Sequence, residues 1–222
     1  MTSDSISGSS APGRVVLLNG SSSSGKTTLA QALQRHSEQP LQYLALDHFR
    51  DGMPDQIRGL NSPPGTPGHS GLNVVPRSVA GQRLTHIEFG DVGKRVLRGM
   101  RRAVQALANE GVDVVVDDIL FEPAFLADYA QVLLHVPTYL VGVRCSLACV
   151  EAREAMRPGR FPGTARSHFD SVHAHGAGYD VEVDTEAMGP RDCAKRVLNR
   201  LTNAPQALTR YLAGTCFPMG SD

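Results

Sequence analysis

Apolar residues in this chain gather in five short runs, which are separated by longer segments of mixed polarity. The runs cover residues 14–19, 42–46, 112–118, 138–144 and 179–184. The middle three are apolar at almost every position, as strands are when both faces of a parallel sheet are covered. The last run alternates between apolar and polar residues, which predicts a strand at the edge of the sheet.

Helical periodicity fills most of the intervals between these runs. The pattern predicts helices at about 27–35, 87–109, 147–156, 165–174 and 191–201. In the longest of them, Val92, Val96 and Met100 belong to one apolar stripe, and Gly111 follows as a helix stop. Strands that alternate with helices predict an α/β fold, in which helices cover both faces of a parallel sheet.

Two segments fall outside this pattern. Residues 55–85 include the sequence NSPPGTPGHSGLNVVP, and so long a stretch without periodicity predicts either a functional loop or disorder. Residues 1–12 are rich in Ser and Gly and poor in apolar residues, so we expect a disordered tail. The remaining residues, 13–222, have the length of a single domain.

A phosphate-binding motif, GSSSSGKT, joins the first run to the first helix and matches G-x-x-x-x-G-K-[ST] at every fixed position. In such a loop, backbone N–H groups surround the phosphates and the helix N-terminus adds partial positive charge. Lys26 should reach the β- and γ-phosphates of ATP, and the Thr27 hydroxyl should bind Mg²⁺. The residues predicted to bind the nucleotide are Gly20, Ser21, Ser22, Ser23, Ser24, Gly25, Lys26, Thr27 and Thr28.

Aspartates stand at the ends of two predicted strands. Asp117 and Asp118 end the run 112–118, where P-loop enzymes place a carboxylate that holds Mg²⁺, often through water. The alternative is a solvated strand end, and the strand period does not decide which of the two faces the metal. Asp47 follows the run 42–46, where an acidic residue can accept the proton of an acceptor hydroxyl. The alternative for Asp47 is a helix N-cap.

A basic cluster, consisting of Arg153, Arg157 and Arg160, follows the fourth run. Arg153 and Arg157 are four residues apart and therefore share a helix face. Arginines on a segment that closes over the phosphates would neutralise developing charge and exclude water. The alternative is a solvated helix face on which Glu151 and Glu154 are the partners.

Composition narrows the class of partner. The 22 basic and 22 acidic residues balance, which gives no electrostatic reason to expect a nucleic-acid partner. No apolar stretch is long enough to predict a membrane span, and the N-terminus has no signal-peptide pattern. The four cysteines form no CxxC pair, so we expect free thiols in a reducing cytoplasm. The chain lacks the N-K-x-D motif of a GTPase. These features favour a cytoplasmic small-molecule kinase.

At this point the chain resembles the chloramphenicol phosphotransferase family. The resemblance rests on LLNGSSSSGKT, DHFRDGMP, VVVDD, GVRCSLACVEAREAMRPGR and YDVEVDT, which together span about residues 14–185. It implies a three-layer fold like that of shikimate and nucleoside monophosphate kinases, with a five-stranded parallel sheet in the order 2-3-1-4-5 and a helical lid. It also implies phosphorylation of an antibiotic hydroxyl by ATP and Mg²⁺. Asp47 then corresponds to the catalytic base, and residues 153–166 to the arginine-bearing lid.

The sequence departs from the family pattern between about residues 55 and 87, where it carries a longer insert rich in Pro and Gly. In the family this region shapes the acceptor pocket. The resemblance therefore predicts the reaction of this protein but not the identity of its acceptor. A nucleoside or sugar-containing antibiotic is as plausible as chloramphenicol. A metabolic kinase for a nucleoside, sugar or cofactor and a non-catalytic nucleotide-binding module are the alternatives. A homodimer could use residues 87–109 or the C-terminal segment.

Overall fold

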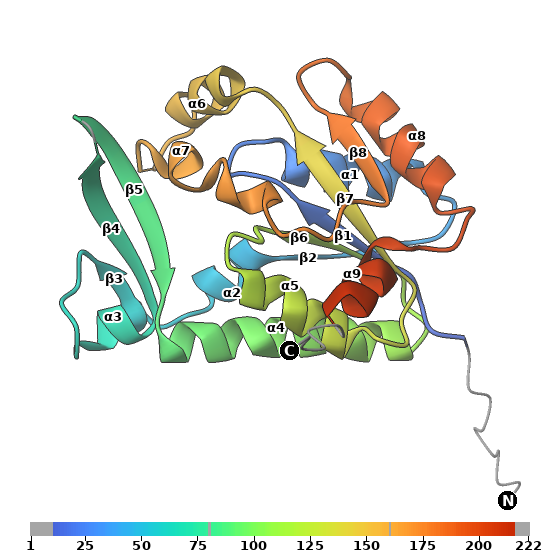
Figure 1. The fold of residues 1–222 in the computed structure, drawn as a ribbon, viewed down its shortest axis with the longest axis horizontal. Coiled ribbons are helices and arrows are strands. Elements are labelled where there is room, and N and C mark those ends of the chain that lie inside the picture. Colours follow the sequence, from blue (N-terminus) through green and yellow to red (C-terminus); the bar gives the residue numbers. More distant parts are fainter. Residues whose placement is uncertain (1–10, 80, 160, 216–222) are drawn as a thin grey trace, which may run out of the picture.

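The computed structural model describes residues 11–79, 81–159 and 161–215 of the chain. The predicted tail therefore falls largely outside the described residues. The described part is an α/β fold with a five-stranded sheet and a separate three-stranded sheet. Helices cover both faces of the larger sheet, and the smaller sheet stands beside one end of it (Figure 1).

The larger sheet contains the five predicted strands. They are β1 (Val15–Asn19), β2 (Gln42–Ala45), β6 (Val114–Asp118), β7 (Thr138–Arg144) and β8 (Val181–Asp184). Their spatial order is β2-β6-β1-β7-β8, and every pair is parallel. When only these strands are counted, this is the predicted order 2-3-1-4-5. The alternating strand β8 lies at the edge, as expected.

Successive residues of β1 face opposite layers of the core, because side chains alternate across a strand. Val15 and Leu17 pack in one hydrophobic cluster, whereas Val16 and Leu18 pack in the other. The first cluster includes residues of α4 (Asp91–Asn109), α5 (Pro123–Val132) and α9 (Ala207–Thr215). The second includes residues of α1 (Lys26–His36) and α8 (Pro190–Arg200). Among the described residues, every helix is too short or too polar to cross a bilayer.

The predicted helices differ from the structure at several places. The helix predicted from residue 87 begins at Asp91, because residues 87–89 belong to a strand. The one predicted at 165–174 is divided into α7 (Thr164–His168) and a 3₁₀ helix, η2 (Ser171–His173). Helix α5 was not predicted. Helix α6 (Leu147–Ala155) agrees with the prediction to within a residue.

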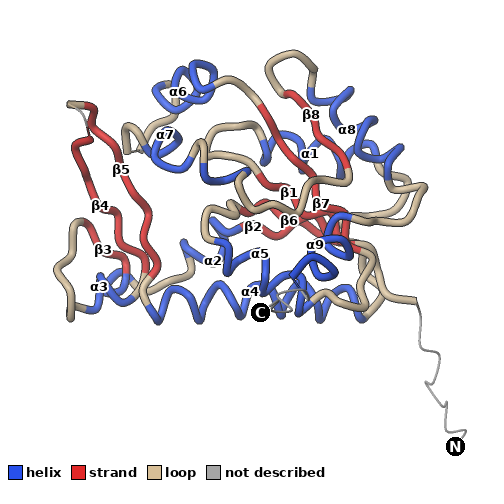
Figure 2. The backbone as a smooth tube through the Cα atoms, viewed as in Figure 1, coloured by secondary structure: helices blue, strands red, loops and turns tan. Residues whose placement is uncertain are grey.

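The prediction of a loop or disorder at residues 55–85 is wrong. This segment contains η1 (Asp55–Ile57), β3 (Arg58–Leu60), α3 (Pro67–Ser70) and β4 (Leu72–Val79), followed by β5 (Gln82–Phe89). Strand β4 pairs with β3 in parallel and with β5 in antiparallel (Figure 2, red). Much of β4 and β5 is exposed, so their apolar alternation is weak and the sequence pattern missed them. The Pro and Gly residues lie mostly in the connection between β3 and β4.

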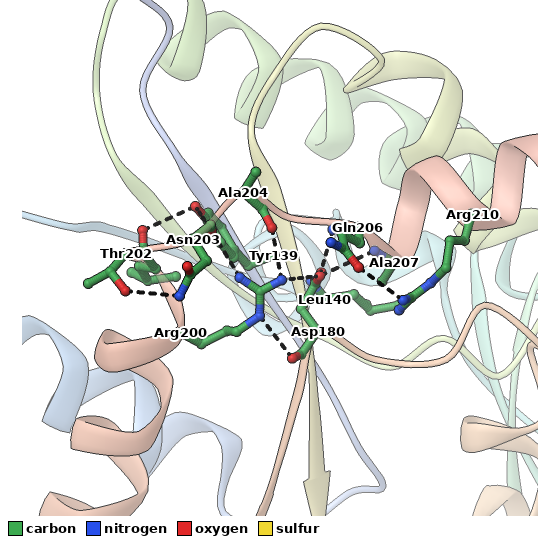
Figure 3. A network of polar contacts seen from close by, with 11 residues as sticks. Tyr139, Leu140, Asp180, Arg200, Thr202, Asn203, Ala204, Gln206, Ala207 and Arg210 are labelled. Atoms are coloured by element: carbon green, nitrogen blue, oxygen red, sulfur yellow. Dashed lines mark hydrogen bonds and ion pairs between the residues drawn. The ribbon is translucent and has the colours of Figure 1, made fainter.

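A partly buried charged network fixes the amino-terminal part of β7, away from its carboxyl end (Figure 3). The Asp180 carboxylate accepts hydrogen bonds from the backbone N–H of Leu140 at 2.9 Å and of Gln206 at 2.7 Å. Arg200 forms an ion pair with Asp180 at 3.1 Å and donates to the carbonyls of Asn203 and Ala204. The network therefore ties β7 to the end of α8 and the start of α9.

Candidate active site

The loop between β1 and α1 has the backbone shape of a phosphate cradle. Gly25 has a φ of 97°, which favours glycine, and Ser23 adopts a φ of 62°. A Cβ at Gly20 would lie 2.5 Å from the carbonyl oxygen of Val143, so this position also requires glycine. The loop leads directly into the N-terminus of α1, which begins at Lys26. These features turn backbone N–H groups towards an anion site.

The Lys26 ammonium group lies within this loop. Its Nζ donates hydrogen bonds to the carbonyls of Gly20 at 2.9 Å and Ser21 at 3.0 Å. It also lies 3.7 Å from Oδ1 of Asp117, and the side chain is 6% exposed. The loop therefore encloses a buried positive charge beside a carboxylate.

The adjacent aspartates at the end of β6 point to opposite sides of the sheet. Asp117 Oδ2 accepts hydrogen bonds from Thr27 Oγ1 at 2.8 Å and from Tyr43 Oη at 3.3 Å. Burial and the neighbouring Asp117 raise the pKa of Tyr43 to about 12, so the phenol remains a donor. Asp117 and Thr27 thus offer oxygen ligands of the kind that Mg²⁺ prefers.

Asp118 lies in the core on the other face and is 0% exposed. Its carboxylate accepts hydrogen bonds from Tyr129 Oη at 2.9 Å and from the backbone N–H of Ile119 at 2.7 Å. Burial raises the pKa of Asp118, and the charge of Arg101 opposes that rise. A metal role for Asp118 does not fit this geometry, so Asp117 is the carboxylate that we retain for the metal.

Two cavities open at the carboxyl ends of the strands, and they share one wall. The first has a volume of about 590 Å³ and follows the phosphate-binding loop. The second has a volume of about 690 Å³ and follows the β3–β5 sheet. The residues that line both cavities are Ser22, Leu46, Asp47, Ile119 and Arg157.

The first cavity is lined by the loop between β1 and α1 and by side chains from more distant parts of the chain. Residues 22–28 line it, whereas Gly20 and Ser21 lie behind it and present their carbonyls to Lys26. Thr28 belongs to this lining, and its contact with a nucleotide stays a prediction. Side chains from α6, from the segment after β8 and from α8 also line the cavity, namely Arg153, Met156, Thr185, Met188, Pro190 and Cys193.

Asp47 lies in α2 (Leu46–Asp51), one residue beyond the start of that helix. The N-cap position is Ala45, so the N-cap alternative for Asp47 does not apply. The Asp47 side chain is 44% exposed, and its Oδ1 accepts a hydrogen bond from Arg50 Nη1 at 2.8 Å. The carboxylate therefore stands on the wall between the two cavities with a guanidinium group beside it.

The arginines of the predicted lid occupy different places. Arg153 donates to Thr185 Oγ1 and to the Thr185 carbonyl, both at 2.9 Å, and to the Ser24 carbonyl at 3.4 Å. It thereby joins α6 to the phosphate-binding loop. Arg157 is exposed and lines both cavities. Arg160 lies outside the described residues.

Glu151 and Glu154, the alternative partners of these arginines, have other contacts. Glu154 is 6% exposed and accepts hydrogen bonds at 2.8 Å from the backbone N–H groups of Gly163 and Ala165. Glu151 pairs with Arg166. Glu154 thus binds the start of α7 to α6 and shapes the lid segment.

Sequence reasoning missed three residues of the site: Tyr43, Thr185 and His168. Tyr43 donates to Asp117, and Thr185 contacts Arg153 and the Ser24 carbonyl. His168 Nε2 accepts a hydrogen bond from the backbone N–H of Ser22 at 3.0 Å. Thr185 ends the motif YDVEVDT, but that motif gave it no role, and Tyr43 and His168 stand in no quoted motif, so only the fold reveals the contacts of the three.

Comparison with known proteins agrees with this geometry. The model of the family described as chloramphenicol phosphotransferase-like protein matches residues 13–202. A Mycobacterium tuberculosis H37Rv protein, provisionally named an O-phosphotransferase, is 28% identical over 193 residues, which cover 83% of this chain and 80% of the relative.

Solved structures show the same fold at low sequence identity. A sugar kinase of Janibacter sp. HTCC2649 has a TM-score of 0.59 at 20% identity, covering 88% of this chain and 98% of the kinase. The APS kinase CysC of M. tuberculosis, solved with AMPPNP and APS, has a TM-score of 0.60 at 17% identity and covers 87% and 100%. The chain therefore belongs to the chloramphenicol phosphotransferase-like family and is a P-loop phosphotransferase that acts on a hydroxyl group.

Proposed function

We propose that this protein uses ATP and Mg²⁺ to phosphorylate a hydroxyl group of a small-molecule antibiotic, either chloramphenicol-like or containing a nucleoside or sugar. The observation that carries the proposal is the position of Asp47, which lines both cavities. A nucleotide in the first cavity and an alcohol in the second would meet beside this carboxylate. We call the first cavity the nucleotide cavity and the second the acceptor cavity.

The nucleotide cavity suits both the triphosphate and the base of a nucleotide. The N–H groups of residues 25–28, around the start of α1, and the Lys26 ammonium group would hold the phosphates. Met156, Met188 and Pro190 provide apolar surface in the lining, against which a base could pack. Arg153, fixed by Thr185, and Arg157, on the shared wall, would balance negative charge as the phosphoryl group moves.

Thr27 and Asp117 are the residues that fit the metal. Their oxygen atoms lie 2.8 Å apart beside Lys26, and hard oxygen ligands suit Mg²⁺. When bound, Mg²⁺ neutralises charge on the β- and γ-phosphates. The Thr27 hydroxyl, which donates to Asp117 in this structure, would turn its lone pair to the ion.

The transfer step requires an oriented acceptor more than a strong base, because the transition state of phosphoryl transfer is loose. The acceptor oxygen forms a bond to the γ-phosphorus while the bond from that phosphorus to the β–γ bridging oxygen breaks. The hydroxyl proton passes to the Asp47 carboxylate, and the products are ADP and a phosphate monoester. Arg50, which donates to Asp47 Oδ1, would hold the carboxylate in place.

The lining of the acceptor cavity supports an amphipathic acceptor. Leu60, Phe121 and Phe161 provide apolar surface, whereas Arg58 and Asp55 lie among its polar groups. A drug-like molecule with an apolar body and a hydroxyl group has this character. Phosphorylation would add roughly two negative charges to it, which would spoil its fit to a target.

Phosphorus NMR of ATP with Mg²⁺ and a panel of antibiotics and metabolites tests the proposal. We expect a new phosphoester signal and stoichiometric ADP with an antibiotic alcohol. The contrary result is a signal with an ordinary nucleoside, sugar or cofactor at micromolar KM and no signal with any antibiotic. It would show that the acceptor is a metabolite and not an antibiotic. Cys145, Cys149 and Cys193 are free thiols, which supports a reducing, cytoplasmic setting for this reaction.

A further inference from the structure

His168 touches the phosphate-binding loop from the side of the acceptor cavity. Its Nε2 accepts a hydrogen bond from the backbone N–H of Ser22 at 3.0 Å. The side chain is 7% exposed, it lines the acceptor cavity, and its ring centroid lies 5.8 Å from that of Phe121. A buried imidazole thus contacts the loop where the two cavities meet.

We propose that His168 is a positioning residue, whose neutral imidazole accepts the Ser22 N–H and so fixes the loop at the γ-phosphoryl end of the nucleotide. This inference rests on the proposed function. His168 acts through Ser22 and does not itself exchange a proton with the substrates.

The position of Ser22 identifies the γ end. Within residues 20–28, Ser22 lines both cavities, whereas residues 23–28 line the nucleotide cavity alone. The phosphoryl group must move from one cavity to the other, so it must pass the residues on the shared wall. A displaced Ser22 would therefore misplace the transferred group more than the β-phosphate, which lies nearer the start of α1.

The surroundings of His168 keep its ring neutral. Burial, Lys26 and His86 lower the pKa of His168 to about 3. Nδ1 lies 3.4 Å from Ser167 Oγ, which leaves Nε2 as the acceptor for Ser22. In a protonated ring Nε2 also carries a hydrogen and would face the Ser22 N–H as a second donor. Only the neutral ring can therefore accept this hydrogen bond and hold the loop.

The backbone around His168 is fixed on both sides. Before it, the Glu154 carboxylate accepts hydrogen bonds from Gly163 and Ala165. After it, the Val172 carbonyl accepts a hydrogen bond at 2.7 Å from Asn19 Nδ2, at the end of β1. The segment 163–172 is therefore attached to the lid helix α6 and to β1, and His168 joins that segment to the loop.

Two substitutions separate the hydrogen bond from the packing of the ring. His168→Gln keeps an acceptor near the position of Nε2 but removes the ring, whereas His168→Phe keeps a ring against Phe121 but removes the acceptor. We would measure kcat and KM for ATP with the acceptor found by phosphorus NMR. Calorimetry with ADP and with the ATP analogue AMPPNP needs no acceptor.

We expect His168→Phe to lower kcat about tenfold, the loss that one buried hydrogen bond can cause. It should weaken AMPPNP binding severalfold and ADP binding less than twofold. His168→Gln should remain within about threefold of the wild type in each measurement. Nitrogen-15 NMR of the wild type should show His168 Nε2 unprotonated at neutral pH, which tests the proposal even if a variant fails to fold.

Wild-type kcat in His168→Phe, with a loss in His168→Gln, would show that packing alone matters and would overturn the inference. Equal weakening of ADP binding and AMPPNP binding would show that His168 does not act at the γ-phosphoryl group. A protonated Nε2 would also overturn it. If the wild type itself transfers phosphate to no acceptor, the proposed function fails, and the nucleotide-binding and NMR results still judge the contact between His168 and Ser22.

Discussion

One short stretch of chain, residues 22–28, supplies the phosphate-binding loop of the nucleotide cavity, whereas the acceptor cavity takes its wall from segments spread between Ser22 and His168. The first is shaped mainly by backbone conformation, as the left-handed Gly25 and the start of α1 show. The second is shaped by side chains of β3, β4 and β5 and of the segment between α6 and the end of α7. Substitutions can therefore change the acceptor without disturbing the phosphate-binding chemistry.

The shared wall is where this difference matters most. Asp47 stands there on a helix of six residues that follows β2, so its position depends on the main sheet. Arg157 stands there on the segment after α6. The proposed function therefore depends on these two residues more than on any residue that lines only one cavity.

The largest expected effect comes from Asp47→Asn, which keeps the shape of the shared wall and removes the proton acceptor. We expect kcat to fall by about 10²- to 10⁴-fold, the contribution of a positioned general base, with little change in ADP affinity. The matched control is Asp51→Asn. Asp51 also pairs with Arg50, at 2.8 Å, but is absent from the described lining of both cavities. Equal losses in the two variants would assign the effect to Arg50 and remove Asp47 from the base role.

The neighbouring aspartates of β6 offer the next test, on the nucleotide side alone. Asp117→Asn should raise the Mg²⁺ concentration for half-maximal activity at least tenfold, because it weakens an ion ligand. Asp118→Asn should instead lower the free energy of unfolding by about 1–3 kcal/mol, because it disturbs a buried hydrogen-bonded carboxylate. Magnesium titrations of activity and thermal unfolding measure the two effects. A Mg²⁺ shift in the Asp118 variant alone would reverse our assignment.

A smaller effect is expected on the acceptor side. Leu60 lines the acceptor cavity and is 62% exposed, so Leu60→Ser should remove apolar contact with the acceptor at little cost to folding. We expect the KM for the acceptor to rise about fivefold, since losing part of an apolar side-chain contact costs about 1 kcal/mol, while the KM for ATP stays the same. Val79→Ser, at a residue 52% exposed on β4 and absent from both linings, is the control. A change in the KM for ATP would mean that the cavities are not independent.

The expected effect that is smallest near neutral pH is a pH dependence of stability from His168. Its pKa of about 3 in the folded protein lies below the ordinary value of 6.5, so the unfolded chain binds more protons between these values. Stability is therefore complete above pH 6.5 and falls as the pH drops towards 3. At pH 6 the expected loss is about 1 kcal/mol.

Urea unfolding of the wild type and of His168→Gln between pH 7.5 and 5 isolates this contribution. The variant should show a flatter dependence, because it lacks the group that the unfolded chain protonates. Identical slopes would mean that His168 titrates normally and is not enclosed as the structure has it.

The sequence predicts the nucleotide cavity better than the acceptor cavity for a physical reason. Eight contiguous residues form the cradle, so their spacing alone indicates a phosphate site. The end of β2 similarly predicts a carboxylate at Asp47. The acceptor wall, by contrast, combines β3, β4 and β5 with α7, and such long-range packing leaves little mark on a half-exposed strand such as β4.

Single residues illustrate the same limit. The period of β6 places Asp117 and Asp118 on opposite faces, but only the partners Thr27 and Tyr129 reveal which face is which. His168 belongs to no motif, and the role that we propose for it follows from its contact with Ser22, which is 146 residues away in the sequence. Chemistry that depends on contiguous backbone is therefore predictable, and chemistry that depends on packing is not.

The central claim is that a phosphoryl group crosses the shared wall beside Asp47. A crystal structure with AMPPNP, Mg²⁺ and the acceptor identified by phosphorus NMR tests it most directly. We predict the acceptor oxygen within about 3–3.5 Å of the γ-phosphorus and within hydrogen-bond distance of the Asp47 carboxylate. An acceptor bound away from the β3–β5 sheet, or an Asp47 side chain turned away from the acceptor oxygen, would contradict the account.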